Sequence, residues 1–475
     1  MEYAFCHVHV GLPESAEHKR ASGSKLTPIM THSTLWLSQI QFFSSLGFML
    51  LFLALELGLA WILLYFKVRA LRTGSAAWTQ AYRFWIRVFA LAFVLSFGAS
   101  MPVLIQLGSL WPSLMEHIGE VAGPLLAAAI LTTFIFKSCF LGAMLFGQRR
   151  LVPAAYATVV AMVAIGVTLS TFLLVALLSW MHTPQGAVLV DGRYQVQDWI
   201  QVVFSPALPW YFLLFLLGSG LTAAFLMLGI VAAQTFRRPA DESERHVFKT
   251  ALFVACVAVI LQAVAAAGAV LMSAQYQPAR AAAVFAYWHS GTQVDLPLFS
   301  WSEASPGARQ DALSRQAGSA PWLGRNADGV FRGLDEFSGM SPPVGLTFWS
   351  FRASVIVGGL MAVVSGLVFW RTRRAGFDPG ALSAVSRRVL VGMTFSGWAM
   401  LLSGLCYILF GLFPYAVNGT VTVSQIASET SGRMLWGGLI AHIVVYGVLL
   451  AGFLQLLRHV AHYGVVPVAR RRGRA

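Results

Sequence analysis

Nine long, mostly apolar runs divide the chain, and shorter polar connections separate them. Each run reaches the roughly 20 residues that an α-helix needs to cross the hydrocarbon core of a bilayer. None shows the alternating apolar and polar positions of a membrane β-barrel strand. The pattern therefore predicts an all-α polytopic membrane protein with about nine transmembrane helices. The runs lie at 43–66, 84–109, 124–146, 153–180, 208–233, 248–273, 347–370, 388–413 and 434–457.

The polar stretches at the ends and between the sixth and seventh runs divide the chain into five segments. The N-terminal tail lacks the basic and then apolar layout of a signal peptide. Because membrane-like sequence begins directly after Met30, that residue is an alternative start. A loop as long as the sixth connection is more often functional or disordered than a plain connector. The segments are a polar tail (1–34), helices 1–6 (35–273), the long loop (274–346), helices 7–9 (347–457) and a basic tail (458–475).

Basic residues gather in the odd-numbered connections and in the C-terminal tail, whereas the even-numbered connections are acidic or mixed. Connections on the cytoplasmic side of a membrane carry an excess of lysine and arginine. We therefore predict that the N-terminus and the long sixth loop lie outside and that the C-terminus lies in the cytoplasm. The basic residues include Lys67, Arg69, Arg72, Arg149, Arg150, Arg237, Arg238, Arg371, Arg373, Arg374, Arg470 and Arg474, and the acidic ones Glu116, Glu120, Asp191 and Glu429.

Composition agrees with a membrane protein, because 57% of the residues are hydrophobic and only 11% are charged. Soluble domains carry about 25% charged residues. A net charge of +14 would suggest a nucleic-acid partner in a soluble protein. Here the basic residues lie between apolar runs, so we expect membrane lipid as a partner and no nucleic acid. The four cysteines form neither a CxxC nor a CxxCH motif, so neither a disulfide framework nor c-type haem attachment is indicated.

Two charged residues interrupt the apolar runs, Glu56 in the first and Lys137 in the third. A charge at the centre of a membrane helix costs about 2.5–3.5 kcal/mol on insertion scales. Each lies about 13 residues from the outer end of its helix, or roughly 20 Å at 1.5 Å per residue. The matching depth predicts an ion pair. Such a pair would either lock two helices together or form part of a proton or ion path, and the remaining alternative is that the two charges do not meet.

His442 in the ninth run is the one histidine well inside a predicted span. A b-type haem commonly takes two axial ligands, His with His or His with Met. His442 with a methionine is therefore a candidate ligand pair, and a hydrogen bond to a neighbouring helix is the alternative. No two spans offer paired histidines, which disfavours a typical di-haem cytochrome b.

Short motifs in a fixed order resemble subunit I of the cytochrome bd-type quinol oxidases. Each is weak alone, but together with nine spans and a long sixth loop they are moderately specific. The resemblance covers nearly the whole chain from about residue 35. The motifs are Leu37–Phe42 (LSQIQF), Arg83–Trp85 (RFW), His117–Glu120 (HIGE) with Gly123 and Pro124, Phe146–Leu151 (FGQRRL), Gln277–Trp288 (QPARAAAVFAYW), Phe351–Arg352 (FR) and Gly411–Tyr415 (GLFPY).

This resemblance implies a subunit with three haems that oxidises quinol at its outer loop, beside a second membrane subunit in the plasma membrane. At the family's haem-ligand positions, however, this chain carries other residues. Where the family has a His in the first helix, this chain has Met49, and where the third helix has two Glu it has Ala129 and Lys137. The fifth-helix His is replaced by Leu214, the seventh-helix Met by Ser354 and the eighth-helix Glu by Leu409. Leu412 replaces the Arg of the turn. In the quinol loop, which includes Trp288, Arg280 replaces a Lys and Phe285 a Glu.

Leucine, alanine and serine are not ordinary haem-iron ligands, and phenylalanine cannot act as a base for a quinol hydroxyl. We therefore expect a haem-deficient, non-catalytic or altered subunit of an electron-transport complex, with no cofactor assigned and quinone binding left open. One alternative is an active oxidase subunit with rearranged ligands, using Met49, His442 or residues of a partner. The other is an ion- or proton-coupled transporter using Glu56 and Lys137.

Overall fold

The computed structural model describes residues 32–292, 294–296, 315–317, 324–325, 329–337, 339–428 and 430–463. The alternative start at Met30, Glu429 and the tail arginines Arg470 and Arg474 lie outside the described residues.

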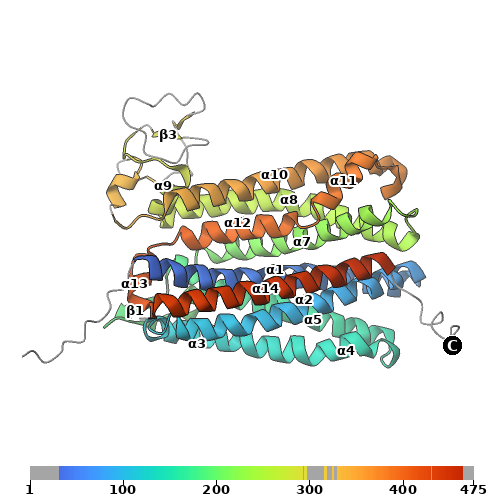
Figure 1. The fold of residues 1–475 in the computed structure, drawn as a ribbon, viewed down its shortest axis with the longest axis horizontal. Coiled ribbons are helices and arrows are strands. Elements are labelled where there is room, and N and C mark those ends of the chain that lie inside the picture. The colour runs from blue at the N-terminus through green and yellow to red at the C-terminus, as the bar shows by residue number, and fades with distance from the viewer. Residues whose placement is uncertain are drawn as a thin grey trace, which may run out of the picture.

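Nine helical segments in the described parts of the chain are long and apolar enough to cross a membrane. They run side by side along the long axis of the molecule (Figure 1). The expected all-α architecture with about nine spans is therefore confirmed, while its orientation in the membrane stays a prediction. The spans are α1 (His32–Thr73), α2 (Ala76–Ser109), α3 (Leu114–Thr132) with η1 (Thr133–Cys139) and α4 (Phe140–Phe146), α5 (Pro153–His182), α7 (Leu208–Gln234), α8 (Glu242–Tyr276), α10 (Val344–Thr372), α11 (Ala384–Gly392) with α12 (Ser396–Phe410), and α14 (Gly432–Tyr463).

Helix α1 forms the centre of the bundle, because it contacts α2, α5, α7, α12 and α14. Apart from Glu56, its middle turns are apolar on every side, which is typical of a helix that other helices surround. Phe52, Leu55 and Leu59 are all fully buried. The other spans pack as neighbouring pairs, α3 with α5, α7 with α8, and α10 with α12.

Glycines allow the closest helix contacts. A Cβ added to Gly58 of α1 would lie 2.2 Å from the carbonyl oxygen of Ser219 in α7, and one added to Gly229 of α7 would lie 2.1 Å from Oγ1 of Thr394. Small residues at such contacts let two backbones approach where lipid gives no hydrophobic driving force for association. The same approach could not be made with any larger side chain.

Two spans depart from a regular α-helix. The third contains the seven-residue π-helix η1 between α3 and α4. The eighth, which the hydrophobic pattern suggested as one run, is interrupted between the end of α11 at Gly392 and the start of α12 at Ser396. Thr394, which contacts Gly229, lies in this interruption.

The short elements lie at the two ends of the bundle. One end carries the β1–β2 hairpin, whose Asp191-Gly192 turn has positive φ at both residues, as a tight two-residue turn requires. Figure 1 shows β1, α9, α13 and β3 at this end. Its elements are β1 (Ala187–Val190), β2 (Arg193–Val196), α6 (Trp199–Val203), α9 (Pro278–Phe285), β3 (Val294–Leu296), β4 (Arg315–Ala317), η3 (Leu334–Phe337), β5 (Tyr415–Val417), β6 (Val421–Thr422) and α13 (Val423–Ile426); η2 (Gly147–Arg149), η4 (Arg373–Ala375) and η5 (Pro379–Ala381) belong to connections at the other end.

Candidate functional site

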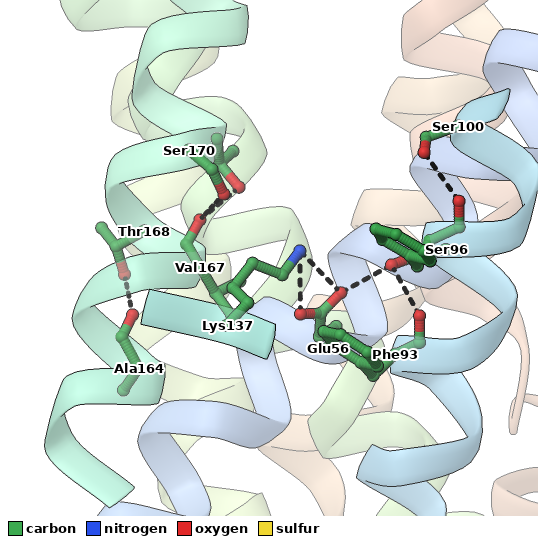
Figure 2. Close-up of polar contacts among 11 residues, drawn as sticks. Glu56, Phe93, Ser96, Ser100, Lys137, Ala164, Val167, Thr168 and Ser170 are labelled. Carbon is green, nitrogen blue, oxygen red and sulfur yellow. Dashed lines mark hydrogen bonds and ion pairs between the residues drawn. The ribbon is translucent and has the colours of Figure 1, made fainter. Parts of the chain in front are cut away.

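Glu56 and Lys137 meet in the interior of the bundle. The Lys137 ammonium nitrogen lies 3.0 Å from Oε1 and 3.3 Å from Oε2 of Glu56. The Ser96 hydroxyl of α2 donates a hydrogen bond to Oε2 at 2.6 Å. Figure 2 shows the three side chains pointing toward one another from three different helices. Both charges are almost completely buried, so the contact joins α1, α2 and η1 with its charge balanced.

The π-helix places Lys137 in this contact. A π-helical turn widens the helix, and such turns are often found at functional sites. Gly166 of α5 makes room for the widened segment, because a Cβ there would lie 2.2 Å from Cβ of Phe136, the residue before Lys137. The ring of Phe93 lies on another side of the ammonium group, with its centre 5.5 Å from Nζ. Helix geometry and packing therefore aim the ammonium group at Glu56.

One large apolar cavity of about 920 Å³ lies beside this pair. Its volume falls at the upper end of the roughly 300–1,000 Å³ typical of ligand sites, which are mostly apolar with a few placed polar groups. The shape and apolar lining of this cavity suit an apolar molecule or a lipid chain.

The residues that the resemblance places at the family's haem-ligand positions, called the substituted family positions, line this same cavity, although they are far apart in the sequence. Its other polar lining groups include Ser96 and Gln262, whereas the Glu56 carboxylate lies outside the lining. The structure therefore brings together residues that the sequence placed in five different spans. The positions are Met49, Ala129, Lys137, Leu214, Ser354 and Leu409.

These side chains do not fit an axial ligand pair for haem iron. Met49 offers a thioether, but among the described residues no histidine lines the cavity. His442 lies apart from it. Its Nδ1 is 2.6 Å from the carbonyl oxygen of Gly438, which can only accept, so Nδ1 carries the proton. Its Nε2 therefore accepts a hydrogen bond from the Gln106 amide at 2.9 Å, and neither ring nitrogen has a lone pair to offer.

A second polar cluster forms around Arg280, whose side chain is fully buried at the start of the long loop. Its Nη1 donates to the Tyr211 hydroxyl at 2.7 Å and to Oε1 of Gln277 at 2.6 Å. Its Nη2 donates to the Tyr407 hydroxyl at 3.0 Å. Nδ1 of His182 lies 3.2 Å from Nη1. Among the described residues, no carboxylate pairs with this guanidinium.

Helix ends supply the missing negative potential. Helix α5 ends at His182, α8 ends one residue before Gln277, and Tyr407 lies in the last turn of α12. The carbonyl groups at a helix C-terminus act as about half a negative charge, and three such ends converge on Arg280. Burial alone would lower the pKa of Arg280, but the Tyr211 and Tyr407 hydroxyls raise it on balance, so the guanidinium stays charged.

The two tyrosines connect this cluster to the large cavity, which both of them line. Each hydroxyl accepts a hydrogen bond from Arg280, so its own proton is left to donate, and no described residue accepts it. Nε2 of buried His182 likewise has no partner among the described residues. The cluster therefore offers hydrogen-bond donors at the end of the cavity nearest to α9.

Sequence reasoning missed three members of this cluster. His182 lies beyond the predicted fourth run, which ends at residue 180, whereas α5 continues to His182. Tyr211 and Tyr407 carried no signal, since tyrosines near span ends are typical of any membrane protein. Phe285 and Trp288 of the loop lie elsewhere, packed against an apolar cluster that includes Phe331.

Residues 37–465 match the family model described as cytochrome bd terminal oxidase subunit I. The chain belongs to this family. It is 24% identical to the cytochrome bd ubiquinol oxidase subunit 1 of Bacillus subtilis (strain 168), covering 88% of this chain and 90% of that one. It is 23% identical to the cytochrome bd-II ubiquinol oxidase subunit 1 of Escherichia coli (strain K12), covering 90% and 96%.

The fold is that of a solved bd oxidase from Geobacillus thermodenitrificans. The two structures superpose with a TM-score of 0.80 over 90% of this chain and 98% of the other, at 22% sequence identity. The resemblance read from the ordered motifs is thus confirmed, and the chain is a cytochrome bd oxidase subunit I-like, multi-pass membrane protein.

Proposed function

We propose that this bd subunit I-like protein keeps the family scaffold but not its haems, and acts as a pseudoenzyme subunit in a membrane electron-transport complex. The observation that carries the proposal is the cavity. Met49, Ala129, Leu214, Ser354 and Leu409 all line it, and their side chains include no imidazole or carboxylate. The helices around the cavity still pack on one another through their apolar side chains, so the scaffold does not require a cofactor to hold its helices together.

A second, subunit II-like membrane protein is the proposed partner, in the plasma membrane of a bacterial cell. The names of the relatives from B. subtilis and E. coli, each a subunit 1 of a bd-type oxidase, support this assignment. A haem-free subunit I would then contribute to assembly or regulation of the complex.

The cavity and the Arg280 cluster together favour an amphiphilic ligand with an oxygen acceptor. Its apolar part would fill the space around Met49 and Leu409, and its oxygen would accept from the Tyr211 and Tyr407 hydroxyls. Quinones and membrane lipids both belong to this class. In either case the protein positions the molecule, since Phe285 offers no base in the loop for removing a quinol proton.

Optical spectroscopy of the purified protein tests the haem-free proposal. The oxidised and dithionite-reduced spectra should lack stoichiometric haem bands, and the E. coli relative, purified in the same way, serves as the matched control. One or more haems per chain would overturn the proposal and favour the alternative of rearranged ligands. Changing Met49 and His442 singly would then identify which residue binds iron.

An ion- or proton-coupled transporter using Glu56 and Lys137 is the alternative from another functional class. The structure offers less support for it, because Glu56 is fully buried and does not line the cavity. Its carboxylate already has two partners, Lys137 and Ser96. A structural lock between helices agrees better with these contacts than an exchangeable ion site does.

A further inference from the structure

A second cavity of about 600 Å³ lies at the other end of the bundle, between α1, α2, α7 and α8. It is separate from the large cavity and from the Arg280 cluster. Two cationic side chains and one histidine line it, together with aromatic and apolar ones. The positive-inside pattern predicts that this end faces the cytoplasm. The cationic residues are Arg69 and Lys249, and the histidine is His246.

The ring of Trp78 organises the cationic side of this cavity. Trp78 is buried, and the imidazole of His246 stacks on it with ring centres 4.2 Å apart and planes 2° apart. The Arg69 guanidinium lies 5.5 Å from the centre of a Trp78 ring. Lys249 lies three residues after His246 on α8, and residues three apart share a helix face. Groups from α1 and α8 are therefore gathered around one residue of α2.

The positive charge here is not balanced from within the cavity. No acidic residue lines it. The nearest carboxylate is that of Glu242, 3.5 Å from Nε2 of His246, and its side chain is 74% exposed. Among the described residues, no carboxylate pairs with Arg69 or Lys249, although Lys249 also lies 5.4 Å from the ring centre of Phe377. The cavity is therefore complementary to an anion.

The rest of the lining is apolar and leads along the helices. Leu57, Leu216 and Val254 continue the cavity away from the cationic residues, and Gly220 leaves space between them. Trp61 and Tyr65 form its outer rim, with 43% and 45% of their surfaces exposed. Aromatic residues of this kind mark the level of the lipid head groups. A ligand that fits this cavity therefore has an anionic group and an apolar part in the same molecule.

We propose that this cavity binds an anionic phospholipid. Its phosphate oxygens contact Arg69, Lys249 and His246, and one acyl chain lies along Leu57, Leu216 and Val254. Basic pockets between helices on the cytoplasmic side are known to suit anionic head groups. The assignment does not depend on whether the protein holds haem.

Native mass spectrometry and thermal unfolding of the purified full-length chain in neutral detergent test this site. Phosphatidylglycerol should be retained, and should raise the unfolding temperature, more than phosphatidylcholine with the same acyl chains. The double variant Arg69→Gln/Lys249→Gln should remove this difference between the two lipids. The control is Arg373→Gln/Arg374→Gln, which removes the same charge from exposed side chains at the same end, outside the cavity, and should preserve the difference.

Three results would overturn the proposal. First, the wild-type chain could retain phosphatidylglycerol and phosphatidylcholine equally and be stabilised equally by both. This result is obtained without any variant, so it does not depend on whether a variant folds. Inorganic phosphate alone could reproduce the whole thermal shift, so that the apolar lining contributes nothing. A small membrane polypeptide, rather than phospholipid, could be retained by the wild-type chain and lost from the double variant.

Discussion

The contact between Glu56 and Lys137 has a large effect on the stability of the protein, because both charges are buried within the membrane-spanning helices. Lys137 has one carboxylate partner and the ring of Phe93 beside it. Glu56 has Lys137 and Ser96. Removing either charge leaves the other buried and unpaired, which costs about 3–5 kcal/mol. Replacing both costs much less, because neither group is then left without a partner.

A double-mutant cycle with Lys137→Met and Glu56→Met measures this coupling. We expect each single change to lower the unfolding free energy by about 3–5 kcal/mol, and the double change to cost less than either. Thermal or denaturant unfolding of the detergent-solubilised protein is the measurement. If the single effects add up in the double variant, the two residues are not coupled. Proton or ion flux lost in both single variants, with stability unchanged, would instead favour the transporter.

Arg280 is the second residue whose chemistry depends on its neighbours. Its guanidinium donates to Tyr211 and Gln277 from Nη1 and to Tyr407 from Nη2, and a lysine, whose donors share one nitrogen, cannot reproduce this planar fork. We expect Arg280→Met to lower the unfolding free energy by more than about 2 kcal/mol, since it leaves the buried Gln277 oxygen without its donor. Arg280→Lys should lie between Arg280→Met and the wild type.

Thermal unfolding with Arg433→Met as control completes this comparison. Arg433 is an exposed residue of α14, so its change should stay within about 0.5 kcal/mol. An Arg280→Met variant as stable as the control would mean that the Arg280 cluster adds nothing to the fold.

At the scale of elements, close helix contacts rest on glycines that no hydrophobic pattern reveals. Gly58 touches the backbone of α7, whereas Gly98 on α2 has no atom within 4 Å of a Cβ placed there. Both are glycines inside long helices, so alanine improves helix propensity equally at each by about 1 kcal/mol. The difference between the two substitutions therefore reports the packing of α1 on α7.

We expect Gly58→Ala to destabilise the protein or prevent its accumulation, because Cβ would lie 2.2 Å from the Ser219 carbonyl oxygen. Gly98→Ala should be neutral or stabilising by up to about 1 kcal/mol. Thermal unfolding and membrane yield of the two variants give the comparison. Equal behaviour of the two would show that α1 and α7 are not packed this closely.

The irregular elements were beyond the reach of the sequence for a physical reason. Both the π-helix η1 and the interruption between α11 and α12 lie inside runs that hydropathy treats as single spans. Hydropathy depends on composition, and it does not change when a helix gains a residue per turn or bends. These features depend on contacts with other helices, namely Gly166 against Phe136 and Gly229 against Thr394.

At the scale of the whole molecule, the orientation in the membrane is still a prediction from the basic connections. We expect green fluorescent protein fused to the C-terminus to fluoresce in the cytoplasm. Alkaline phosphatase inserted within 297–314 of the long loop should be active outside, and the same enzyme at the C-terminus should be inactive. The reverse pattern would mean that the positive-inside rule fails for this chain.

The sequence by itself determined the nine spans, the family and the matched depth of Glu56 and Lys137. Those properties follow from local hydropathy, from ordered motifs and from the constant rise of a helix. Only the tertiary structure decided that the substituted family positions line one cavity, that Ser96 joins the ion pair, and that His182, Tyr211 and Tyr407 surround Arg280. Each of these depends on how helices rotate and approach one another, and glycine contacts and packing set that rotation.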